Sequence, residues 1–520
     1  MLLVGDMVRR NAARYPDKTG VVFEERRFTW QEVNMRVNSL AHGLLKLGLE
    51  KQSRVAILSR NCNEYLEFYL AVAKAGLIGV ALNPMFKAGE LGYLIDDSGS
   101  DTLIVDSYYE DKVASMQSEL HRIKHYIGIG PGHSFPYDFE TIIAENPTRE
   151  LEVEVDENDI FVLAYSSGTT GRPKGAMITH RNCVTAAVVN AMEYGMQPYH
   201  VYALPGAFYF ATCNGARLVP IVRGCTTVIT TWDPEELLPI IEKERVWGYN
   251  GGPTVHSRIV NHPDFEKYDV SSIGFIAVTT SPCSTSLWRK LEEIFGHVCY
   301  ACFGMTESTK AGPVLHPAEI ATEGSEKLVR RMSSVGRSAG IWDIRVVNES
   351  GEDVAWDMKE IGELIMKGDH IMKGYWNDPQ MTAETIRDGW LYTGDLATVD
   401  EDGYIYIVDR RTDMIKSGGI NVYPREIEEV IYTHPAVSLA AVIGVPDERW
   451  GETVKAVVVL KPNAKATEED IIELCKIKLA SYKKPTSIDF VDSMPLTAGG
   501  KILKRELKKK YWEDYDRLVH

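Results

Sequence analysis

The first two-thirds of the chain alternate short apolar runs with stretches of helical spacing. Between the runs, apolar residues recur every three or four positions, which indicates amphipathic helices, and we expect Asp6 and Asn61 to cap two of them. The same alternation resumes over residues 159–302. Strands that alternate with helices predict an α/β fold of largely parallel sheets covered by helices on both faces. The runs of strand length include residues 55–58, 77–82 and 102–105.

Two changes of pattern divide the rest of the chain. Over residues 335–409, short strands of alternating polarity are separated by turns rich in glycine and aspartate, which predicts a small antiparallel sheet or β-barrel-like subdomain. Residues 410–520 have the pattern of a compact α+β unit. We therefore expect a large N-terminal domain, residues 1–409, whose α/β part covers about 1–334, and a small C-terminal domain.

One stretch that follows a buried strand is dense in glycine, hydroxyl and cationic side chains. Residues 165–175 read YSSGTTGRPKG and come directly after an apolar run. Glycines let backbone N–H groups converge on an anion, hydroxyls add donors, and Arg172 and Lys174 add positive charge. A helical pattern opens near Thr179. We predict a phosphate-binding loop between a strand and a helix, with a flexible surface loop as the alternative.

This loop follows neither of two widespread nucleotide-binding patterns. A Walker A loop needs a second glycine five residues after the first, and Pro173 stands there instead. The dinucleotide pattern G-x-G-x-x-G is also missing, because residues 128–132 read GIGPG and are followed by His133. The stretch therefore belongs to another class of phosphate site.

Composition limits the class of protein. The 520 residues are too many for one core, and 44% hydrophobic with 25% charged residues is typical of a globular enzyme. A net charge of −16 argues against nucleic-acid binding, which favours a basic surface. The longest apolar stretch, residues 68–82, contains Lys74 and is shorter than the ~18 residues of a membrane span. No secretory signal is visible at the first residues.

The cysteines indicate a reducing compartment such as the cytoplasm, and two of them are expected in the core. Eight cysteines are scattered along the chain, as expected in a reducing compartment. Cys299 and Cys302 have C-x-x-C spacing, with His297 just before them, but a zinc site would need a second pair and the sequence has none. We expect both cysteines to be core residues of a strand.

Five motifs, in order, make the chain similar to AMP-forming adenylate ligases. This family contains acyl-CoA and aryl-CoA ligases, peptide-synthetase adenylation domains and luciferases. The resemblance spans essentially the whole chain and implies the family's fold, including a mobile C-terminal domain over residues 410–520. The motifs are the stretch 165–175, FGMTE at 303–307, WLYTGDL at 390–396, DRRTDMIKSGG at 409–419 and PLTAGGKI at 495–502.

The resemblance implies roles for residues around the phosphates of ATP. Thr306 is expected to contact phosphate. Glu307 is expected to hold Mg²⁺, which agrees with the preference of a hard cation for carboxylate and phosphate oxygens. An exposed acid at a strand end is the alternative for Glu307. The loop residues expected to surround the phosphates, together with Lys174, are Ser166, Ser167, Gly168, Thr169, Thr170 and Gly171.

The resemblance also implies contacts to adenosine. A carboxylate can accept hydrogen bonds from both hydroxyls of a ribose, so Asp395 suits that place, and Arg410 is expected to contact ribose and phosphate. A simple turn is the alternative for the Gly394-Asp395 pair. The residues expected near adenine are Thr280, Ser281, Phe303 and Gly304.

In the C-terminal region the resemblance implies a hinge, a CoA path and a catalytic lysine. Thr412 holds the hinge position, where the family usually has Asp or Lys. Gly418 and Gly419, next to Lys416, would let the pantetheine arm of CoA pass close to the backbone. Lys501 follows two glycines and would reach the α-phosphate during adenylation. A solvated basic tail is the alternative, which we accept for the lysines and arginine that follow Lys501.

The acid pocket is where the sequence departs from the family. Residues 204–211 read LPGAFYFA, so Phe208 stands where the family often has histidine, and TTSP at 279–282 replaces an adenine-side GAAP. A pocket without that histidine is more apolar, so we expect a fatty, aromatic or alicyclic acid. Arg217 is expected to be structural, with pairing to a second carboxylate as the alternative. The expected pocket residues are Phe208, Tyr209, Phe210, Tyr249, Gly251, Val278 and Ala301.

The predicted reaction is the ATP-dependent ligation of a carboxylic acid to CoA, with ATP, Mg²⁺ and coenzyme A as cofactors and cosubstrates. The carboxylate attacks the α-phosphorus of Mg·ATP and releases pyrophosphate, and the CoA thiolate then displaces AMP from the acyl-adenylate. Charge that accumulates at the α-phosphate is stabilised by positioned donors, and no side chain needs to become covalent.

Three alternatives stay open on the sequence. A kinase-like protein or ATPase would cleave at the γ-phosphate and release ADP. An acyl-AMP ligase would load a carrier protein, although no carrier domain is visible in the chain. A non-catalytic binding module would not need Glu307 and Lys501. No nucleic acid and no integral membrane segment are expected, and a homodimer is an open arrangement.

Overall fold

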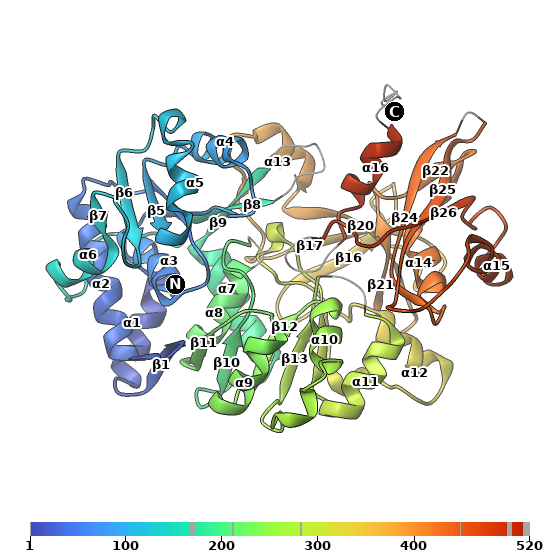
Figure 1. The fold of residues 1–520 in the computed structure, drawn as a ribbon, viewed down its shortest axis with the longest axis horizontal. Coiled ribbons are helices and arrows are strands. Elements are labelled where there is room, and N and C mark those ends of the chain that lie inside the picture. The colour runs from blue at the N-terminus through green and yellow to red at the C-terminus, as the bar shows by residue number, and fades with distance from the viewer. Residues whose placement is uncertain are drawn as a thin grey trace.

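The computed structural model describes residues 2–166, 173–210, 213–280, 283–447, 449–496 and 502–512. Within these ranges the chain forms four sheets, two large and two small. Figure 1 shows the two large sheets with their helices on the left and in the centre, and the C-terminal unit on the right. The predicted class, α/β with a separate β part and a small α+β part, is confirmed.

The first large sheet is built from the early apolar runs. Its strands are β3 (Arg54–Leu58), β4 (Ile78–Ala81), β5 (Thr102–Asp106), β6 (His125–Ile129), β7 (Tyr137–Asp138), β8 (Ile160–Ser166), β9 (Lys174–Thr179) and β18 (Gly374–Tyr375). They lie in the order β18-β9-β8-β4-β3-β5-β6-β7, and the pairs from β8 through β7 are parallel. Their nearly continuous apolar character suits strands buried on both faces.

The second large sheet continues the same design. Its strands are β1 (Thr19–Phe23), β2 (Arg26–Thr29), β10 (Val201–Leu204), β11 (Thr226–Ile229), β12 (Gly248–Gly251), β13 (Phe275–Val278), β14 (Cys299–Cys302) and β15 (Val314–Leu315). The order is β15-β14-β13-β12-β10-β11-β1-β2. The six inner strands are parallel, and only the edge strands β2 and β15 pair antiparallel.

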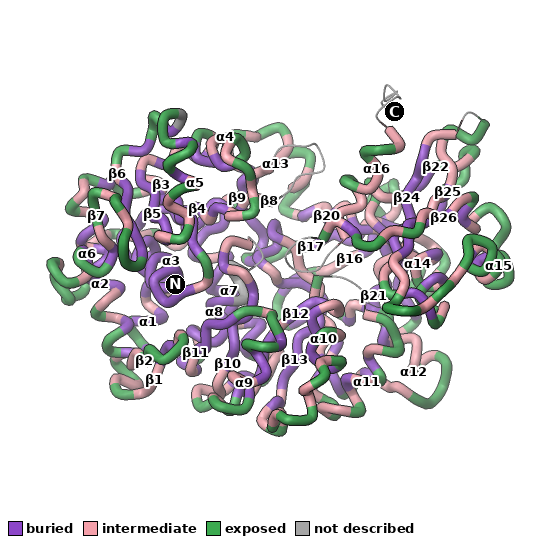
Figure 2. The backbone as a smooth tube through the Cα atoms, in the orientation of Figure 1, coloured by how far each residue is buried: buried purple, intermediate pink, exposed green. Residues whose placement is uncertain are grey.

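Helices cover and separate these sheets. Among them, α3 is buried along its whole length, and α7 packs against α8. Figure 2 shows buried backbone concentrated in the strands and in α3 and α7. The helices are α1 (Val4–Arg14), α2 (Trp30–Lys46), α3 (Asn63–Ala75), α4 (Ala88–Ser98), α5 (Glu110–Ala114), α6 (Phe139–Glu145), α7 (His180–Glu193), α8 (Cys213–Arg223), α9 (Pro234–Glu244), α10 (Pro253–Val260), α11 (Thr285–Phe295), α12 (Glu326–Arg330) and α13 (Pro379–Thr385).

The two small sheets follow in the last third of the chain. The first contains β16 (Asp343–Val347), β17 (Gly362–Lys367), β19 (Ile386–Arg387), β20 (Trp390–Val399) and β21 (Ile405–Arg410), and all its pairs are antiparallel, as predicted. The second contains β22 (Ile415–Ser417), β23 (Ile420–Val422), β24 (Val437–Asp447), β25 (Gly451–Leu460) and β26 (Ser487–Phe490). Its helices are α14 (Pro424–Tyr432), α15 (Glu468–Lys478) and α16 (Lys504–Trp512). The chain changes from one small sheet to the other between Arg410 and Ile415.

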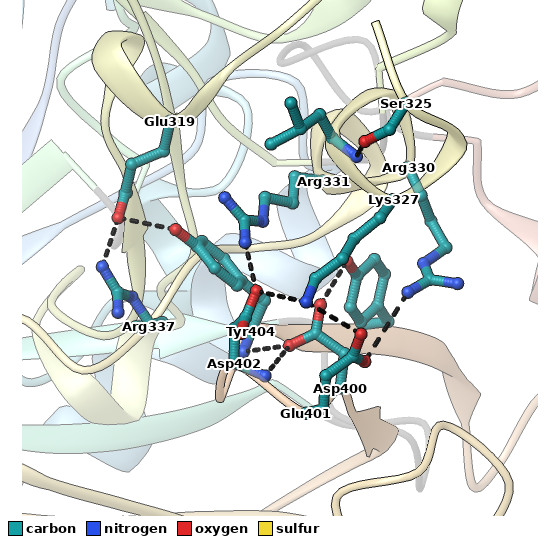
Figure 3. Close-up of polar contacts among 12 residues, drawn as sticks. Glu319, Ser325, Lys327, Arg330, Arg331, Arg337, Asp400, Glu401, Asp402 and Tyr404 are labelled. Carbon is teal, nitrogen blue, oxygen red and sulfur yellow. Dashed lines mark hydrogen bonds and ion pairs between the residues drawn. The ribbon is translucent and has the colours of Figure 1, made fainter.

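A polar cluster joins the helical segment at 325–333 to the tip of the β20–β21 hairpin (Figure 3). Lys327 Nζ lies 2.9 Å from both Glu401 Oε1 and Asp402 Oδ2, and Arg331 also pairs with Asp402. Asp400 is fully buried and accepts a hydrogen bond from the Tyr406 hydroxyl at 2.9 Å. The cluster therefore fixes the hairpin tip with charged partners.

Three local predictions were wrong. Asp6 is not a helix cap: α1 begins at Val4, and Asp6 Oδ2 accepts from the Leu3 backbone N–H at 3.1 Å from inside the first turn. Asn61 is not a cap of α3 either. Its amide donates to the Gly206 and Thr230 carbonyls at 3.0 Å, because the side chain joins two loops that are far apart in the sequence.

The predicted phosphate-binding loop was also placed wrongly. It does not connect a strand to a helix, because β9 follows it and pairs antiparallel with β8 before α7 begins. Thr179 then caps α7 by accepting from the Asn182 backbone N–H. The loop is therefore the connection of the β8–β9 hairpin, which lies next to the edge strand β18 of the first large sheet.

Candidate active site

Three side chains from distant segments meet beside the phosphate loop. The Tyr375 hydroxyl donates to Glu307 Oε1 at 2.8 Å, and Lys174 Nζ lies 5.7 Å from the centre of the Tyr375 ring. Glu307 is 7% exposed. Burial, and then the Glu307 carboxylate, raise the pKa of Tyr375 well above its usual value, so the hydroxyl stays protonated and donates. Tyr375 therefore fixes the Glu307 carboxylate through its hydroxyl and contacts the Lys174 ammonium through its ring.

Backbone hydrogen bonds also hold the segment that carries Glu307. Thr306 and Glu307 lie in a single 3₁₀ turn, Thr306–Ser308, and the Met372 N–H donates to the Glu307 carbonyl at 2.9 Å. The Thr309 hydroxyl donates to the His370 carbonyl at 2.8 Å. The segment after β14 is thereby tied to the loop that precedes β18, which positions the predicted Mg²⁺ and phosphate ligands.

Asp395 and Arg410 face each other across the β20–β21 hairpin, where they are paired in register. Arg410 Nε donates to Asp395 Oδ1 at 3.1 Å, and Asp395 raises the pKa of the Arg410 guanidinium. Asp395 is 4% exposed, and its Oδ2 atom has no hydrogen-bond partner in the part of the chain that the structure describes. The predicted ribose ligands thus lie together, with one carboxylate oxygen available.

A tight turn presents the Asp395 carboxylate. Gly394 has φ +73°, a left-handed conformation that favours glycine, and its N–H donates to Glu363 Oε1 at 2.9 Å. The Thr393 hydroxyl donates to the Leu364 carbonyl and accepts from the Asp395 N–H. The Thr-Gly-Asp motif is therefore a hydrogen-bonded turn anchored on β17.

The predicted hinge residue lies between the two small sheets along the chain, and the predicted CoA residues lie on the first hairpin of the second one. Thr412 is exposed in a turn closed by the Asp413 N–H, which donates to the Arg410 carbonyl at 2.9 Å. Gly418 and Gly419 form the β22–β23 turn with φ +56° and +81°. A Cβ on Gly418 would lie 2.6 Å from the Trp450 ring, so close packing there requires glycine. Lys416 is exposed on β22.

A small, partly open cavity lies next to Phe303 and Gly304. Its volume is about 40 Å³. It lies between α7 and α8 on one side and one face of β10, β12, β13 and β14 on the other. The lining residues are Asn190, Tyr194, Tyr202, Val219, Asn250, Ala277, Thr279, Cys302, Phe303, Gly304 and Lys310.

The residues predicted for the acid pocket do not line this cavity. Tyr249, Val278 and Ala301 pack on the opposite face of the second large sheet, against α9, α10 and α11, and Gly251 shares their face. Phe208 is fully buried in the core, where its ring meets Tyr65 edge-on. Among the predicted pocket residues, Tyr209 lines a second cavity of about 420 Å³ near Trp232, and Phe210 packs on Tyr209.

The side chains that line the cavity alternate with the predicted ones. In the register of the sheet, Asn250 pairs with Ala277, and Ala277 pairs with Tyr300. Cys302 lies on the same face, two residues after Tyr300. Successive side chains of a strand point to opposite faces. The predicted pocket residues of these strands therefore lie on the face opposite the cavity. Burial raises the pKa of Cys302 to about 12, so its thiol is neutral.

The structure also places the paired cysteines, Arg217 and Thr280. Cys299 and Cys302 are strand residues without a metal cluster, and the described residues contain no group of three or more His, Cys, Asp or Glu arranged for a metal ion. Arg217 is buried and donates to the Phe208 carbonyl at 3.0 Å, as a structural residue would. The described helices include none long and apolar enough to cross a membrane. Thr280 has φ +73° at the end of β13.

Several predicted site residues lie outside the described ranges. They are Ser167, Gly168, Thr169, Thr170 and Gly171 of the phosphate loop, Ser281, and Lys501. For Ser166 only the backbone is described, as the last residue of β8. Sequence reasoning missed one residue of the candidate site, Tyr375. It lies between the motifs in a GYW run, and no local sequence pattern marks it.

Family models match both parts of the chain. The model of the AMP-binding enzyme matches residues 8–376, and that of the AMP-binding enzyme C-terminal domain matches residues 426–501. The chain therefore belongs to the AMP-binding enzyme family. Within this family it is an AMP-forming acyl-CoA synthetase, a class whose substrates include ATP and CoA.

Curated relatives and solved structures agree with this class. The chain is 35% identical to a feruloyl-CoA synthase of Amycolatopsis over 98% of this chain and 99% of the relative. It is 33% identical to a long-chain-fatty-acid–CoA ligase of Bacillus subtilis over 97% and 94% of the two chains. The structure of the anthranilate CoA ligase AuaEII with anthranoyl-AMP matches with a TM-score of 0.89 at 27% identity, over 98% and 97% of the chains.

Proposed function

We propose that this enzyme activates a hydrophobic carboxylic acid, and that the residues around Asp395, Tyr375 and Lys174 bind ATP. The observation that carries the site is the buried Asp395 Oδ2 atom, which has no partner among the described residues. A buried carboxylate oxygen without a donor is unfavourable. The two hydroxyls of a ribose would supply donors to both Asp395 oxygens, with Arg410 beside them.

Positioned charges then serve the adenylation step. Lys174, Thr306 and the loop 166–171 hold the phosphates while the acid's carboxylate oxygen attacks the α-phosphorus and pyrophosphate leaves. Glu307, fixed by the Tyr375 hydroxyl, would hold the Mg²⁺ that accompanies ATP, and the cation would offset charge on the phosphates. One buried carboxylate fits this role, because Mg²⁺ is usually held by one or two carboxylates plus substrate phosphates. Adenine lies against Phe303, Gly304, Thr280 and Ser281.

The C-terminal domain, proposed as residues 410–520, serves both half-reactions in two positions. Lys501 reaches the α-phosphate for adenylation. Rotation about Thr412 then removes it and brings Gly418 and Gly419 to the path of the pantetheine arm, whose thiolate displaces AMP. The exposed turn at Thr412, between strands of two different sheets, supports a pivot at this position.

The cavity beside Gly304 is proposed as one part of the acid site, because it adjoins the adenine-side motif; its volume of about 40 Å³ accommodates only a portion of the acid. Its aromatic and aliphatic walls favour a fatty, aromatic or alicyclic body. The names of the relatives, which include ligases for ferulate and for long-chain fatty acids, support the same range.

The test is a screen of carboxylic acids with ATP, Mg²⁺ and CoA, in which all products are identified. We expect AMP, pyrophosphate and acyl-CoA, and no ADP. Because each buried methylene contributes roughly 0.8 kcal/mol, a six-carbon or larger apolar acid should exceed acetate in kcat/KM by orders of magnitude. Equal turnover of acetate would contradict the hydrophobic pocket, and release of ADP would contradict the mechanism.

We also propose a cytoplasmic location. The described cysteines are all free thiols, which suits a reducing compartment. A homodimer is the proposed assembly, which light scattering on the purified protein tests directly.

A further inference from the structure

A carboxylate on one side of the proposed hinge caps a helix on the other side. Asp409, near the end of β21, is 6% exposed, and its Oδ2 atom accepts from the Arg425 backbone N–H at 3.1 Å. Arg425 lies in the first turn of α14, where Tyr423 holds the cap position without a side-chain hydrogen bond. An acid at a helix N-terminus satisfies a free N–H group and complements the helix dipole. The N-terminus of α14 is therefore stabilised from across Thr412.

The side chain of Arg425 strengthens the same contact. Its Nη1 atom donates to the Ile407 carbonyl of β21, and its Nε atom lies 3.2 Å from Glu429 Oε1 on α14. Figure 1 shows α14 and β21 together in the right half of the molecule, and the two elements are in contact. These contacts join residues before Thr412 to residues after it, so a rotation about Thr412 has to break them.

A lysine of the last helix completes the cluster. Lys504 was expected in a solvated basic tail, but its side chain is only 16% exposed, and its Nζ atom lies 2.8 Å from Glu428 Oε1 on α14. Burial acts to lower the pKa of Lys504, but the carboxylates of Glu428, Asp409 and Asp413 together raise it, so the ammonium stays charged. Asp409 and Asp413 flank the proposed hinge. The junction cluster consists of Asp409, Arg425, Glu428 and Lys504.

Lys504 is also close in the chain to the proposed catalytic lysine. It follows Lys501 by three positions and is the first residue of α16. Just before it, the Leu503 backbone N–H donates to the Pro495 carbonyl at 2.8 Å. The start of α16 and the segment at Pro495 thus fix both ends of the stretch that contains Lys501.

We propose that Lys504 is a positioning residue for adenylation, because it anchors the stretch that contains Lys501 to the carboxylates around the hinge. Adenylation is the half-reaction that needs Lys501, so the closed junction cluster belongs to the adenylation position of the C-terminal domain. Rotation about Thr412 separates Asp409 from Arg425 and Lys504, so the cluster opens before CoA transfer. This inference rests on the proposed roles of Lys501 and Thr412.

The main experiment measures the two half-reactions of Lys504→Met, which removes the ammonium but keeps a long side chain. We expect acyl-AMP formation to slow by about 10- to 10²-fold, since a displacement of about 1 Å can cost that much in rate. Acyl-CoA formation from supplied acyl-AMP should remain at the wild-type rate or rise, because the domain leaves the adenylation position more easily. Lys504→Arg keeps the charge and should restore most of the adenylation rate.

A second variant tests the partner across the hinge. Asp409→Asn keeps an oxygen for the Arg425 N–H but removes the charge that faces Lys504. It should slow acyl-AMP formation selectively as well. Combined with Lys504→Met, it should add less than its separate effect, because both substitutions act through one contact.

Tryptic cleavage at the hinge gives a readout that does not depend on catalysis. Arg411, beside Thr412, is exposed and offers a cleavage site. Proteolysis follows the population of the opened form when opening is fast, so Lys504→Met should be cut there about tenfold faster than the wild type.

Lys455→Met is the matched control. Lys455 Nζ lies 2.6 Å from Asp489 Oδ1, and the Lys455 side chain is 13% exposed, so the variant loses a comparably buried ion pair of the same domain. This pair joins β25 to β26, away from the junction cluster. The variant should lower the melting temperature but keep the wild-type ratio of the two half-reactions and the wild-type rate of hinge cleavage.

The outcomes distinguish this inference from the proposed function. If no acid yields AMP and pyrophosphate with the wild type, the proposed function fails and this inference fails with it. If the wild type is active but Lys504→Met slows both half-reactions alike, or only CoA transfer, this inference alone is overturned. The same holds if hinge cleavage is unchanged, if Lys504→Arg restores nothing, or if Lys455→Met produces the same selective loss.

Discussion

The two ends of the β20–β21 hairpin use carboxylates in opposite ways. At the tip, Asp400, Glu401 and Asp402 each have a hydroxyl or basic partner (Figure 3). At the base, Asp395 has Arg410 on one oxygen only, and its other oxygen is buried without a partner among the described residues. The fold satisfies the carboxylates at the tip, whereas Asp395 keeps one oxygen for the ribose hydroxyls that we propose it binds.

An unpaired atom alone does not mark a binding site. Both ring nitrogens of buried His370 also lack a partner in the described structure. Burial lowers the pKa of His370 to about 3, so the ring stays neutral and its cost is small compared with that of a carboxylate. Charge, burial and a place beside other predicted ligands together distinguish Asp395.

The largest expected effect comes from removing the unsatisfied carboxylate. Asp395→Ala loses two hydrogen bonds to ribose, each about 1.5–3 kcal/mol when one partner is charged. We expect kcat/KM for ATP to fall by about 10²-fold or more, measured by pyrophosphate release. The urea midpoint should change little. A large loss of stability with normal ATP kinetics would show that Asp395 belongs to the fold.

Lys501→Ala tests a residue that should act in adenylation only, and not in the transfer to CoA. We expect acyl-AMP formation to slow by about 10²–10³, the usual loss for one donor at a developing negative charge. Formation of acyl-CoA from supplied acyl-AMP should remain near the wild-type rate. Equal losses in both assays would instead indicate a structural role for Lys501.

Thr412→Pro tests whether the turn after Arg410 is the pivot. Proline fixes φ near −65°, so the variant should hold the C-terminal domain in one position. We expect adenylation to stay within about tenfold and CoA transfer to fall much further. A pyrophosphate burst and acyl-CoA formation are measured separately on the folded variant. If both rates persist, the pivot lies elsewhere, and Arg411 and Asp413 are the next positions.

The smallest expected effect is at the satisfied end of the hairpin. Asp402→Ala removes partly exposed ion pairs with Lys327 and Arg331, which typically contribute about 0–1 kcal/mol. We expect the free energy of unfolding to fall by that amount, less so at high salt, while kcat/KM for ATP stays within about twofold. A drop in kcat/KM comparable to that of Asp395→Ala would remove the distinction between the two ends.

The sequence alone determined the class of enzyme and most of the architecture. The five motifs carry the side chains from which the site is proposed: glycines and hydroxyls for phosphate, Glu307 for a cation, Asp395 for a diol. The alternation of apolar runs and helical spacing predicted the parallel sheets, and the change of pattern at residue 335 predicted the antiparallel one. These features are readable because each is encoded by residues close together in the chain.

Only the tertiary structure decided which residues meet. Tyr375 reaches Glu307 across 68 positions, and no local pattern announces it. The sequence also did not show which face of β12, β13 and β14 lines the cavity. Strands buried on both sides are apolar on both sides, so the alternation of side chains does not distinguish the two faces. Packing of α7 and α8 on one face assigned Asn250, Ala277 and Cys302 to the cavity and left Tyr249, Val278 and Ala301 in the core.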